Sequence, residues 1–381
     1  MTVAMFHNYR EERQPSMSLY AHRLGEALQR LHVPVQRVRV DPLLPDALRR
    51  GRFVEKADAF WGRFVRYPRV CGAVQADVFH LCDHGEAFLL HRLDAGRTVV
   101  TCHDLMLLLA DAGRLPSPFR APFATKILRL SLREMRRAAA VIAVSEQTRR
   151  DLVSIGGIEE EKITVVHSGL NYPIAPDPSL RAAARRRLAL GERPVLLHVG
   201  SNSFYKNVET VLRVLSQLRR DGVDAVLLKA GQAFSPAQHK LIDDLRLGQA
   251  VSNVGPVSQA TLLELYQAAD ALLFPSLYEG FGWPVLEAMA AGLPVVTSDA
   301  GALTEVAGGA ALHAPALDSD ELACHTARVL TDAHLARELR ARGLARASQF
   351  HWDKTAAEVL AIYERVAGQP LTNAPRTEGV A

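Results

Sequence analysis

Residues 274–296 read FPSLYEGFGWPVLEAMAAGLPVV, and this stretch indicates the fold. An apolar run of the kind found in buried strands ends near Phe274, and a loop with two glycines follows. Pro284 stands where the first turn of a helix tolerates proline, and Gly292-Leu-Pro294 then stops the helix. A second apolar run, Pro294–Thr297, comes next. A strand, a helix and a strand in this order predict a parallel β-α-β unit.

The same alternation extends outward over almost the whole chain, which predicts an α/β fold of parallel sheets covered by helices. The predicted strands are Val3–Phe6, Val35–Val40, Val78–Leu81, Thr98–Thr101, Ala140–Val144, Ile163–Val166, Val195–Val199, Ala225–Ala230, Val251–Val254, Ala271–Phe274 and Pro294–Thr297. The predicted helices include Met17–Arg30, Val208–Arg220, Pro236–Leu247, Gln259–Ala268, Val285–Ala291 and a last helix near His351–Ala367.

The pattern breaks once, at a proline-containing stretch that runs from His167 to Pro178, and a strand-first pattern restarts at Val195. A chain of 381 residues also exceeds what one hydrophobic core usually serves. The expected division is an N-terminal acceptor-binding domain over 1–172 and a C-terminal donor-binding domain over 173–350. We expect the helix 351–367 to return toward the N-terminal domain, and the tail 368–381 to be disordered. Ligands of parallel sheets bind at the carboxyl ends of strands, so the chemistry should lie in a cleft between the halves.

Composition excludes several classes of protein. Hydrophobic residues make up 48% of the chain and charged residues 23%, and no apolar run reaches the roughly 20 residues of a membrane-spanning helix. The start of the chain lacks the features of a signal peptide, so we expect a cytoplasmic protein. Its four cysteines, Cys71, Cys82, Cys102 and Cys324, are expected to be buried, reduced thiols.

The net charge of +4 is unevenly distributed. Residues 1–172 carry 25 Lys and Arg against 19 Asp and Glu, whereas the remainder carries 20 against 22. A partner attracted by positive charge should therefore meet the N-terminal half.

The loop from Glu279 to Gly282 predicts the chemistry of the ligand. Gly280 and Gly282 allow the backbone to approach a ligand closely, and N–H groups at a helix start favour phosphate. Carboxylates such as Glu279 and Glu287 are good acceptors for vicinal hydroxyls. The expected ligand carries both phosphate and sugar hydroxyls.

Glu279 and Glu287 are separated by seven residues, an EX7E arrangement. With its EGFG-P-LEAMA-G-PVV flanks, the segment closely resembles the retaining glycosyltransferases of family 4, also called glycosyl transferases group 1, which have the GT-B fold of two Rossmann-like domains. The resemblance implies that Glu287 holds the ribose of a nucleotide, that Glu279 contacts the donor hexose, and that the backbone of Gly280, Phe281 and Gly282 contacts the sugar or diphosphate. Alternatively, Glu279 caps the loop and Glu287 only favours the helix dipole.

A second phosphate-facing turn follows the strand Val195–Val199. It resembles the G-x5-K-N segment of the family, with Gly200 at its start and Lys206 as the ligand of the donor diphosphate. Many members have an arginine nearby, where this chain has Ser201 and Tyr205, so Lys206 should be more critical here. The alternative is a solvated surface lysine. Val257 lies in a loop that resembles the one packed on the nucleotide base, or else it lies in an ordinary loop.

His103 follows the predicted strand Thr98–Thr101. The family often has His-Asp here, and the histidine then lies near the donor sugar, where His103 could bind a hydroxyl or assist catalysis. A buried structural histidine is the alternative, and Asp104 either orients His103 or caps the next segment. The glycine loop common after the first strand of the family is missing. Arg13, Ser16 and Met17 are therefore the candidate acceptor-binding residues.

Two basic helices are predicted over 49–69 and 117–137. In the first, Arg49, Arg52, Lys56, Arg63 and Arg66 share one face, and Phe53, Ala57, Phe60 and Phe64 share another, flanked by Trp61. In the second, Lys126, Arg129, Arg133, Arg136 and Arg137 lie opposite Ala124, Leu128, Leu132 and Met135. Such helices suit an anionic membrane surface, or simply an apolar face packed on the sheet. Nucleic acid is a poorer explanation, because no known binding module accompanies the charge.

The resemblance implies metal-independent transfer of a hexosyl group from a nucleotide diphosphate sugar to a glycan or lipid-linked acceptor, with retention at the anomeric carbon. GDP-mannose is the first expectation for the donor, followed by a UDP-sugar. The alternatives are an epimerase-like enzyme of the same fold and a catalytically silent membrane-surface scaffold. The sequence Asp318-Ser319-Asp320 has the DxD form of a metal site, but its position predicts a helix cap.

Overall fold

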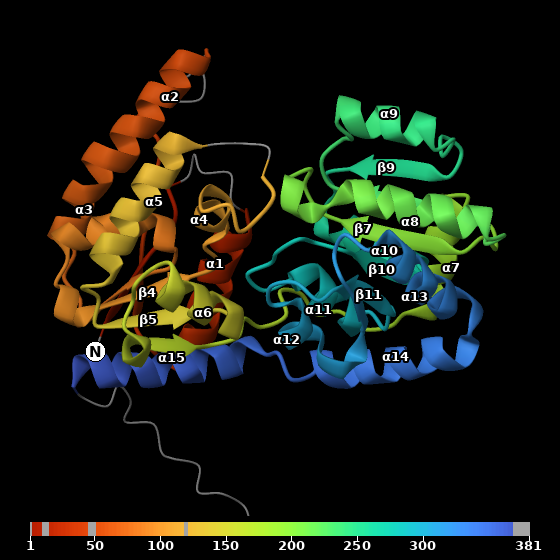
Figure 1. Cartoon of the computed structure of the whole chain (residues 1–381). Coiled ribbons are helices and arrows are strands. Elements are labelled where there is room, and N and C mark those ends of the chain that lie inside the picture. The colour runs from red at the N-terminus through yellow and green to blue at the C-terminus, as the bar shows by residue number, and fades with distance from the viewer. Residues whose placement is uncertain (1, 10–14, 45–50, 118–120, 369–381) are drawn as a thin grey trace, which may run out of the picture. The chain divides into compact units, whose positions relative to one another are not determined.

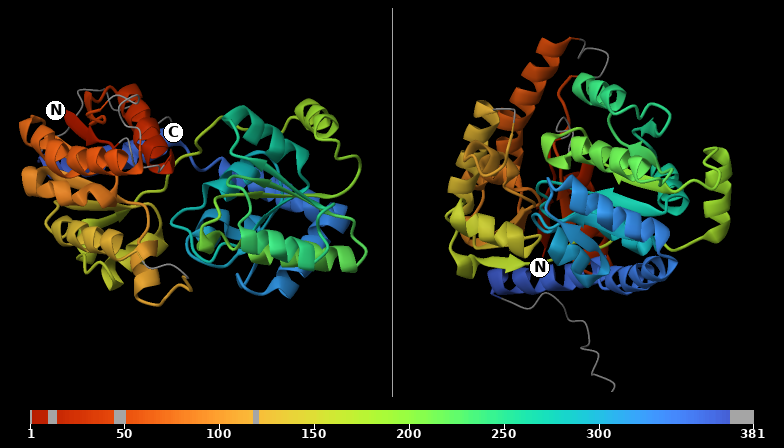
Figure 2. Two further views of the ribbon diagram at one scale, coloured as in Figure 1. Left: turned by 90° about the horizontal axis from the view of Figure 1, so that it is seen from above. Right: turned by 45° about the vertical axis from the view of Figure 1, so that its right-hand side comes forward.

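The computed structural model describes residues 2–9, 15–44, 51–117 and 121–368, and these form two compact units (Figure 1). The first unit groups the described residues of Met1–Leu108 and Ala121–Gly169 with those from His351 onward. The second groups those of Leu109–Arg120 with Leu170–Phe350. Helices lie on both faces of the sheet in each unit (Figure 2). Most of the tail that the sequence predicts to be disordered lies outside the described residues.

The first unit contains a six-stranded parallel sheet in the order β2-β1-β3-β4-β5-β6. Its strands are β1 (Val3–Phe6), β2 (Val35–Val38), β3 (Val78–Leu81), β4 (Thr98–Cys102), β5 (Ala140–Ala143) and β6 (Ile163–Val165). The four strands β1, β3, β4 and β5 are buried along their whole length, as expected of continuous apolar runs in a parallel sheet. The helices around them are α1 (Pro15–Arg30), α2 (Arg52–Trp61), α3 (Tyr67–Ala73), α5 (Pro122–Met135), α6 (Glu146–Ser154) and α15 (Trp352–Ala367). The short helix α4 (Met106–Asp111) contains the boundary between Leu108 and Leu109 that divides the two units.

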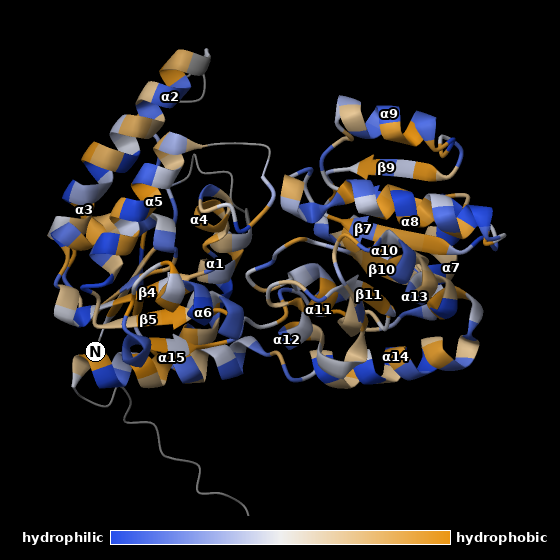
Figure 3. Ribbon diagram, in the orientation of Figure 1, coloured by the Kyte–Doolittle hydropathy of each residue, from blue (hydrophilic) through white to orange (hydrophobic). Residues whose placement is uncertain are grey.

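The second unit contains a six-stranded parallel sheet in the order β9-β8-β7-β10-β11-β12. Its strands are β7 (Val195–Val199), β8 (Val226–Ala230), β9 (Val251–Gly255), β10 (Ala271–Phe274), β11 (Val295–Ser298) and β12 (Leu312–Ala314). Its helices are α7 (Pro178–Arg187), α8 (Val208–Arg220), α9 (Pro236–Asp244), α10 (Gln259–Ala268), α11 (Trp283–Ala290), α12 (Leu303–Ala307), α13 (Ser319–Thr331) and α14 (Ala333–Ala347). Strands such as β5 are uniformly hydrophobic, whereas the helices alternate between the two hydropathy colours (Figure 3). The α/β class and all eleven predicted strands are confirmed, and the short strand β12 is an addition.

The strand order reverses once in each sheet, and these reversals position the candidate sites. In the first sheet, β1 has β2 on one side and β3 on the other. In the second sheet, β7 has β8 on one side and β10 on the other. Connections leave such a pair of strands in opposite directions, so the space beyond their carboxyl ends is where open parallel sheets bind ligands. We call these places the β1/β3 switch point and the β7/β10 switch point.

The last helix, α15, belongs to the first unit although it follows the second in the sequence. Asp353 of this helix accepts a hydrogen bond from Arg30 at 2.6 Å, and the Tyr363 hydroxyl bonds the ring of buried His80. Gly169 is required where the helix begins, because a Cβ there would lie 2.4 Å from the Trp352 nitrogen. The first unit is therefore completed by residues that are distant in the sequence.

The first basic helix departs from the prediction at a π-helical turn, η1 (Gly62–Arg66), between α2 and α3. The wider turn shifts every later side chain relative to a regular helix, so the predicted faces do not persist. Arg63 lies inward, 3.3 Å from Glu86, whereas Phe53, Phe60 and Trp61 are 85%, 53% and 54% exposed. The interpretation that this apolar face packs on the sheet is therefore wrong for these three aromatics, although Phe64 does pack against the core.

The second basic helix, α5, follows the packed alternative. Leu128, Leu132 and Met135 are buried, while Lys126, Arg129 and Arg133 are exposed. Ala124 was expected on the packed face but is exposed, and Phe123 and Leu130 are 64% and 48% exposed. Within the described ranges, no helix is long and apolar enough to cross a membrane.

The cysteines agree with the prediction at three of four positions. Cys71, Cys82 and Cys102 are buried free thiols in the first unit. Cys324 is also a free thiol but is exposed, because it lies on the outer side of α13, so its predicted burial is wrong.

Candidate active site

The turn after β7 holds Gly200 and Lys206. After Gly200, a single 3₁₀ turn (Phe204–Lys206) leads into α8. The Lys206 side chain lies over this backbone, because a Cβ on Gly200 would lie only 3.2 Å from Cδ of Lys206. The Lys206 side chain is only 12% exposed, so the interpretation of a solvated surface lysine is wrong.

The loop after β10 brings Glu279 to this lysine. Lys206 Nζ donates a hydrogen bond of 2.7 Å to Glu279 Oε1, and the carboxylate side chain is 11% exposed. The ammonium also lies 4.9 Å from the ring centroid of Phe274, within the range of cation–π attraction. Because β7 and β10 are neighbours, this buried ion pair spans the β7/β10 switch point.

The two loops are bonded to each other by groups that the sequence interpretation did not assign. Asn207 has a left-handed backbone with φ of 54°, and its amide donates to the carbonyls of Pro275 and Ala316 at 2.9 and 2.7 Å. The backbone N–H of Leu277 donates to the Tyr205 carbonyl at 2.7 Å. These bonds fix Lys206 and Glu279 relative to each other. The one signal for Asn207 in the sequence is the Lys-Asn pair of the G-x5-K-N segment.

Gly280, Phe281 and Gly282 connect Glu279 to the start of α11. Gly282 has a φ of 101°, and a Cβ there would lie 2.7 Å from Cδ2 of Leu303, so the backbone conformation and the space both require glycine. The Phe281 side chain is buried, with its ring 6.0 Å from that of Phe350.

Glu287 is buried inside the unit and lies in the second turn of α11. This position weakens the interpretation that Glu287 only favours the helix dipole, because that effect is confined to the terminal turn. Burial raises the pKa of Glu287 to about 7, against hydrogen bonds from Tyr266 and Asn171 that lower it. The Tyr266 hydroxyl donates to Glu287 Oε2 at 2.9 Å. A carboxylate held in this way costs stability when it is ionised, as is common where a ligand is to be bound.

Tyr266 and Asn171 belong to the site but were missed by the sequence interpretation. Tyr266 lies on α10, in an amphipathic stretch without a recognised motif, and Asn171 lies in the proline-containing stretch between the two predicted domains. Both are buried, and no local pattern signals that their side chains converge on a glutamate.

The remaining predicted positions of the second unit lie farther from the ion pair. Val257 is half-buried in the loop after β9, at the edge of the sheet. Asp318 accepts hydrogen bonds from the N–H groups of Asp320 and Glu321 at 3.2 and 2.9 Å, which confirms that the DxD sequence caps a helix. Across the described ranges, no cluster of three His, Cys, Asp or Glu is arranged to hold a metal ion.

In the first unit, His103 follows β4 and is buried. Its Nε2 lies 2.9 Å from the Cys82 carbonyl, and its ring packs edge-on against Tyr20 at 4.8 Å. Burial lowers the pKa of His103, although Asp83 opposes the shift, so the ring is neutral at pH 7. A carbonyl can only accept, so Nε2 carries the proton and Nδ1 is the acceptor. Asp104 instead accepts from the Met106 N–H at 3.0 Å, which shows that it caps the next segment.

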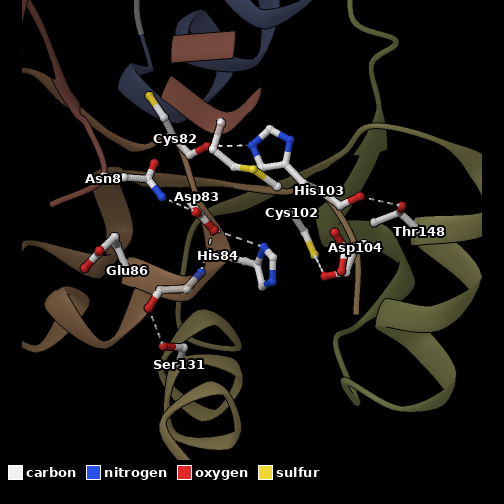
Figure 4. A network of polar contacts seen from close by, with 12 residues as sticks. Asn8, Cys82, Asp83, His84, Glu86, Cys102, His103, Asp104, Ser131 and Thr148 are labelled. Carbon is white, nitrogen blue, oxygen red and sulfur yellow. Dashed lines mark hydrogen bonds and ion pairs between the residues drawn. The ribbon is translucent and has the colours of Figure 1, made fainter. Parts of the chain in front are cut away.

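A polar cluster at the β1/β3 switch point was not predicted (Figure 4). Asp83 accepts from the Gly85 N–H at 2.8 Å and from the amide of Asn8, and it lies 3.2 Å from His84 Nδ1. Burial alone would raise the pKa of Asp83, but His84, His103 and these hydrogen bonds together lower it. Of the candidate acceptor residues, Ser16 and Met17 lie half-buried in the first turn of α1, and Arg13 lies outside the described residues.

Comparison with known proteins agrees with this arrangement. The family model of the glycosyltransferase family 4 domain matches residues 11–172, and that of glycosyl transferases group 1 matches residues 181–346. The chain is a group 1 glycosyltransferase. This assignment makes it an enzyme, and its two sheets form the GT-B fold.

Two relatives and one solved structure illustrate the similarity. The chain is 28% identical over 286 residues to the O-antigen chain mannosyltransferase B of Escherichia coli, covering 74% of this chain and 73% of the relative. It is 32% identical over 240 residues to the MMP alpha-(1->4)-mannosyltransferase of Mycolicibacterium hassiacum, covering 61% of this chain and 56% of the relative. The structure of Anabaena HepE in complex with UDP superposes with a TM-score of 0.71 at 19% identity, covering 96% and 99% of the two chains.

Proposed function

We propose that this glycosyltransferase moves a hexosyl group from a nucleotide diphosphate sugar to a hydroxyl of a glycan or lipid-linked acceptor, with retention at the anomeric carbon. The observation that carries the proposal is the buried Lys206–Glu279 pair across the β7/β10 switch point. A nucleotide diphosphate sugar has a negatively charged diphosphate next to a sugar with several hydroxyl groups. The ammonium group of Lys206 can bind the diphosphate, and the carboxylate of Glu279 can accept hydrogen bonds from the hydroxyls.

Each candidate site residue of the second unit then has a role in donor binding. Lys206 and the backbone N–H groups near Gly282 stabilise charge on the leaving diphosphate, and Gly200 gives the lysine its place. Glu279 binds hydroxyls of the hexose, Glu287 binds the ribose, and Val257 packs near the base. In the first unit, the neutral ring of His103 can accept a hydrogen bond from a sugar hydroxyl through Nδ1, without taking its proton.

The proposed reaction breaks the bond between the anomeric carbon and the diphosphate oxygen and forms a bond to the acceptor oxygen on the same face. The acceptor hydroxyl loses its proton to an oxygen of the departing phosphate, so the balance requires neither a protein nucleophile nor a redox partner. Charge stabilisation by Lys206 is the main contribution of the protein to this step.

The donor proposed first is GDP-mannose. Both relatives described above are named mannosyltransferases, and the mannosyl group is the simplest expectation from their names. A UDP-sugar is the second candidate, because HepE shares the fold and was solved with UDP. The proposed acceptor is a growing envelope polysaccharide or a lipid-linked oligosaccharide.

We propose further that the first unit associates with an anionic membrane surface through residues 49–69 and 117–137. Phe53, Phe60 and Trp61 of α2 are more than half exposed, as is Phe123 of α5. Exposed lysine and arginine side chains accompany them on the same helices, including Lys56, Lys126, Arg129 and Arg133. Exposed aromatics beside basic residues suit the interface of a membrane that carries negative charge.

The test is a screen of the purified protein with GDP, UDP, ADP and dTDP by thermal shift, followed by donor hydrolysis with the matching sugar nucleotides. A ligand at about a hundred times its dissociation constant should stabilise the protein by about 3 kcal/mol. The response should be lost in Lys206→Ala and kept in Lys240→Ala, which changes a lysine that is 75% exposed in the same unit. No response of folded wild-type protein to any nucleotide would refute donor binding and favour a scaffold.

A further inference from the structure

The chain passes between the two units at two places that lie next to each other. It leaves the first unit between Gly169 and Leu170, and it returns between Phe350 and His351. The Leu170 N–H donates to the Phe350 carbonyl at 3.1 Å, so the outgoing and the returning segment are bonded directly. We call these four residues the double passage.

The outgoing segment is bonded to Glu287 through Asn171, the residue that follows Leu170. Asn171 is buried, and its side chain forms a hydrogen bond with Glu287. Its Oδ1 accepts no hydrogen bond within the described ranges, and a carboxylate only accepts, so Asn171 donates through its amide nitrogen. The residue proposed to hold the ribose is therefore one side chain away from the double passage.

The returning segment contacts the loop before α11 through the ring of Phe350. This ring is 5% exposed and lies 6.0 Å from the ring of Phe281, at an interplanar angle of 74°. The guanidinium of Arg346 lies 4.8 Å from the centroid of the Phe350 ring and donates to the carbonyls of Glu305 and Val306 at 2.7 and 3.0 Å. Phe350 is thus held between the donor loop and α12, and each side of the double passage has its own contact with the candidate site.

These contacts couple the order of the double passage to the occupancy of the site. A ligand whose hydroxyls donate to Glu287 restrains the carboxylate and, with it, the bond from Asn171. Ordering of one segment by a ligand is reciprocal, because a segment that is already ordered makes the same ligand bind more tightly. The Leu170 amide reports this order, since it exchanges its hydrogen only when its bond to Phe350 opens.

We propose that Asn171 and Phe350 are positioning residues of the donor site, and that a nucleoside diphosphate bound in the second unit tightens the double passage through them. Each acts through a neighbour in the site, Asn171 through Glu287 and Phe350 through Phe281. The inference rests on the proposed function, because it takes Glu287 as the residue that binds the ribose. Its effect reaches the first unit as well, since His351 leads directly into α15.

Hydrogen–deuterium exchange of the full chain tests the proposal, with GDP and UDP as separate probes and isothermal titration to measure their binding. In the wild type, the nucleotide that binds should slow exchange about tenfold in the peptide that contains Leu170. Asn171→Ala should weaken nucleotide binding about tenfold, because it removes one hydrogen bond to a charged group, and it should abolish the slowing at Leu170. Phe350→Leu keeps an apolar side chain and should weaken nucleotide binding about threefold.

Gln267→Ala is the matched control. Gln267 is also buried, and it holds the same outgoing segment through the Ala175 carbonyl and the Asp177 N–H, each at 2.9 Å, instead of through Glu287. It should leave nucleotide affinity within about twofold of the wild type.

Two results would overturn the inference alone. One is a wild type that binds a nucleotide without any slowing of exchange at Leu170, and this result decides the matter even if Asn171→Ala does not fold. The other is a loss of nucleotide affinity in Gln267→Ala as large as that in Asn171→Ala, which would reduce Asn171 to a support of the segment. A folded wild type that binds neither nucleotide would instead refute the proposed function, and this inference with it.

Discussion

The β1/β3 and β7/β10 switch points have the same topology but opposite chemistry. At β7/β10 a lysine and a glutamate form a largely buried pair, and Gly200 and Gly282 lie in the two loops that carry them. At β1/β3 the corresponding space holds Asp83, Asn8 and two histidines, with Asn8 donating to Asp83. A shared fold therefore fixes where ligands bind, while side chains at the strand ends determine which ligand binds.

The difference between the two switch points teaches how one fold can present different charges at the same place. Lys206 can exchange its partner Glu279 for a diphosphate, because one anion replaces another. Asp83 instead has His84, a histidine rather than a lysine, 3.2 Å from its carboxylate. The predictions below test whether this division of charge is real.

The largest effect is expected for Lys206→Ala. Loss of the cation should lower the rate of transfer or donor hydrolysis about a thousandfold, the upper range for one charge-stabilising group in an active site. The buried Glu279 is then left without its partner, so the free energy of unfolding should fall by about 3 kcal/mol. Steady-state kinetics and urea denaturation measure the two effects. Lys240→Ala should change neither, and a similar loss in that variant would show that charge alone, not position, matters.

A smaller effect is expected for Glu279→Gln. This variant keeps Lys206 and so separates the role of the carboxylate from that of the lysine. Transfer should fall about a hundredfold, because the hexose loses a charged hydrogen-bond partner at the reacting centre. Affinity for the nucleoside diphosphate should stay within about threefold, since Lys206 still meets the phosphates. Isothermal titration and rate measurements separate these outcomes. A drop in nucleotide affinity equal to the drop in rate would contradict a role at the hexose.

Glu287→Gln should weaken nucleotide binding about tenfold and stabilise the protein. The pKa of Glu287 is about 7 in the folded state and about 4.5 in the unfolded state. At a pH between these two values, Glu287 is therefore protonated in the folded protein and ionised in the unfolded protein. The contribution of Glu287 to the free energy of unfolding of the wild type therefore falls as the pH rises from about 4.5 to 7, by on the order of 3 kcal/mol in total. Glutamine does not ionise, so the variant avoids this loss of stability, and its side-chain oxygen can still accept the hydrogen bond from the Tyr266 hydroxyl.

The gain of Glu287→Gln should consequently be small at pH 5 and largest at pH 8, as followed by thermal unfolding at both pH values. Glu321→Gln, a partly exposed residue of α13 in the same unit, provides the control. A stability difference that does not depend on pH would rule out ionisation of Glu287 as its cause.

The smallest effect on the enzyme is expected for the exposed aromatics of the first unit. The variant Phe53→Ser with Trp61→Ser should bind vesicles containing phosphatidylglycerol about fivefold more weakly, because apolar area no longer enters the interface. Its thermal stability and its transfer to a water-soluble acceptor should not change. Vesicle flotation measures binding, with Leu317→Ser as control, since Leu317 is 68% exposed in the other unit. Equal binding of all three proteins would refute the membrane proposal.

The fold and the donor loops could be predicted because their signals are local. Buried parallel strands are short apolar runs, and Gly200, Gly282 and Pro284 mark turns that few other residues permit. Lys206 and Glu279 were identified by motif, and the structure then brought them within 2.7 Å of each other. Their arrangement follows from strand order, which places the two loops on adjacent strands.

The rest depended on contacts between distant segments. Tyr266 and Asn171 form hydrogen bonds with Glu287 from two other parts of the chain, and no residue spacing in the sequence predicts these contacts. The π-helical turn that begins at Gly62 changes the faces of the first basic helix, and Gly62 itself lies against Tyr9, which is distant in the sequence and leaves no room for a Cβ at position 62. Asp83 and His84 were not predicted, because no local pattern in the sequence shows that Asn8 and His103 lie next to them in the fold.

The return of α15 to the first unit also dictates the order in which the protein can be built. The first unit needs Tyr363 beside His80 and Asp353 beside Arg30, yet a ribosome makes these residues after all of Leu170–Phe350. The second unit is continuous over that span and can close as soon as it emerges. The half of the protein that is synthesised first is therefore the half that finishes folding last, and shortening the chain before Trp352 would damage the first unit while leaving the second intact.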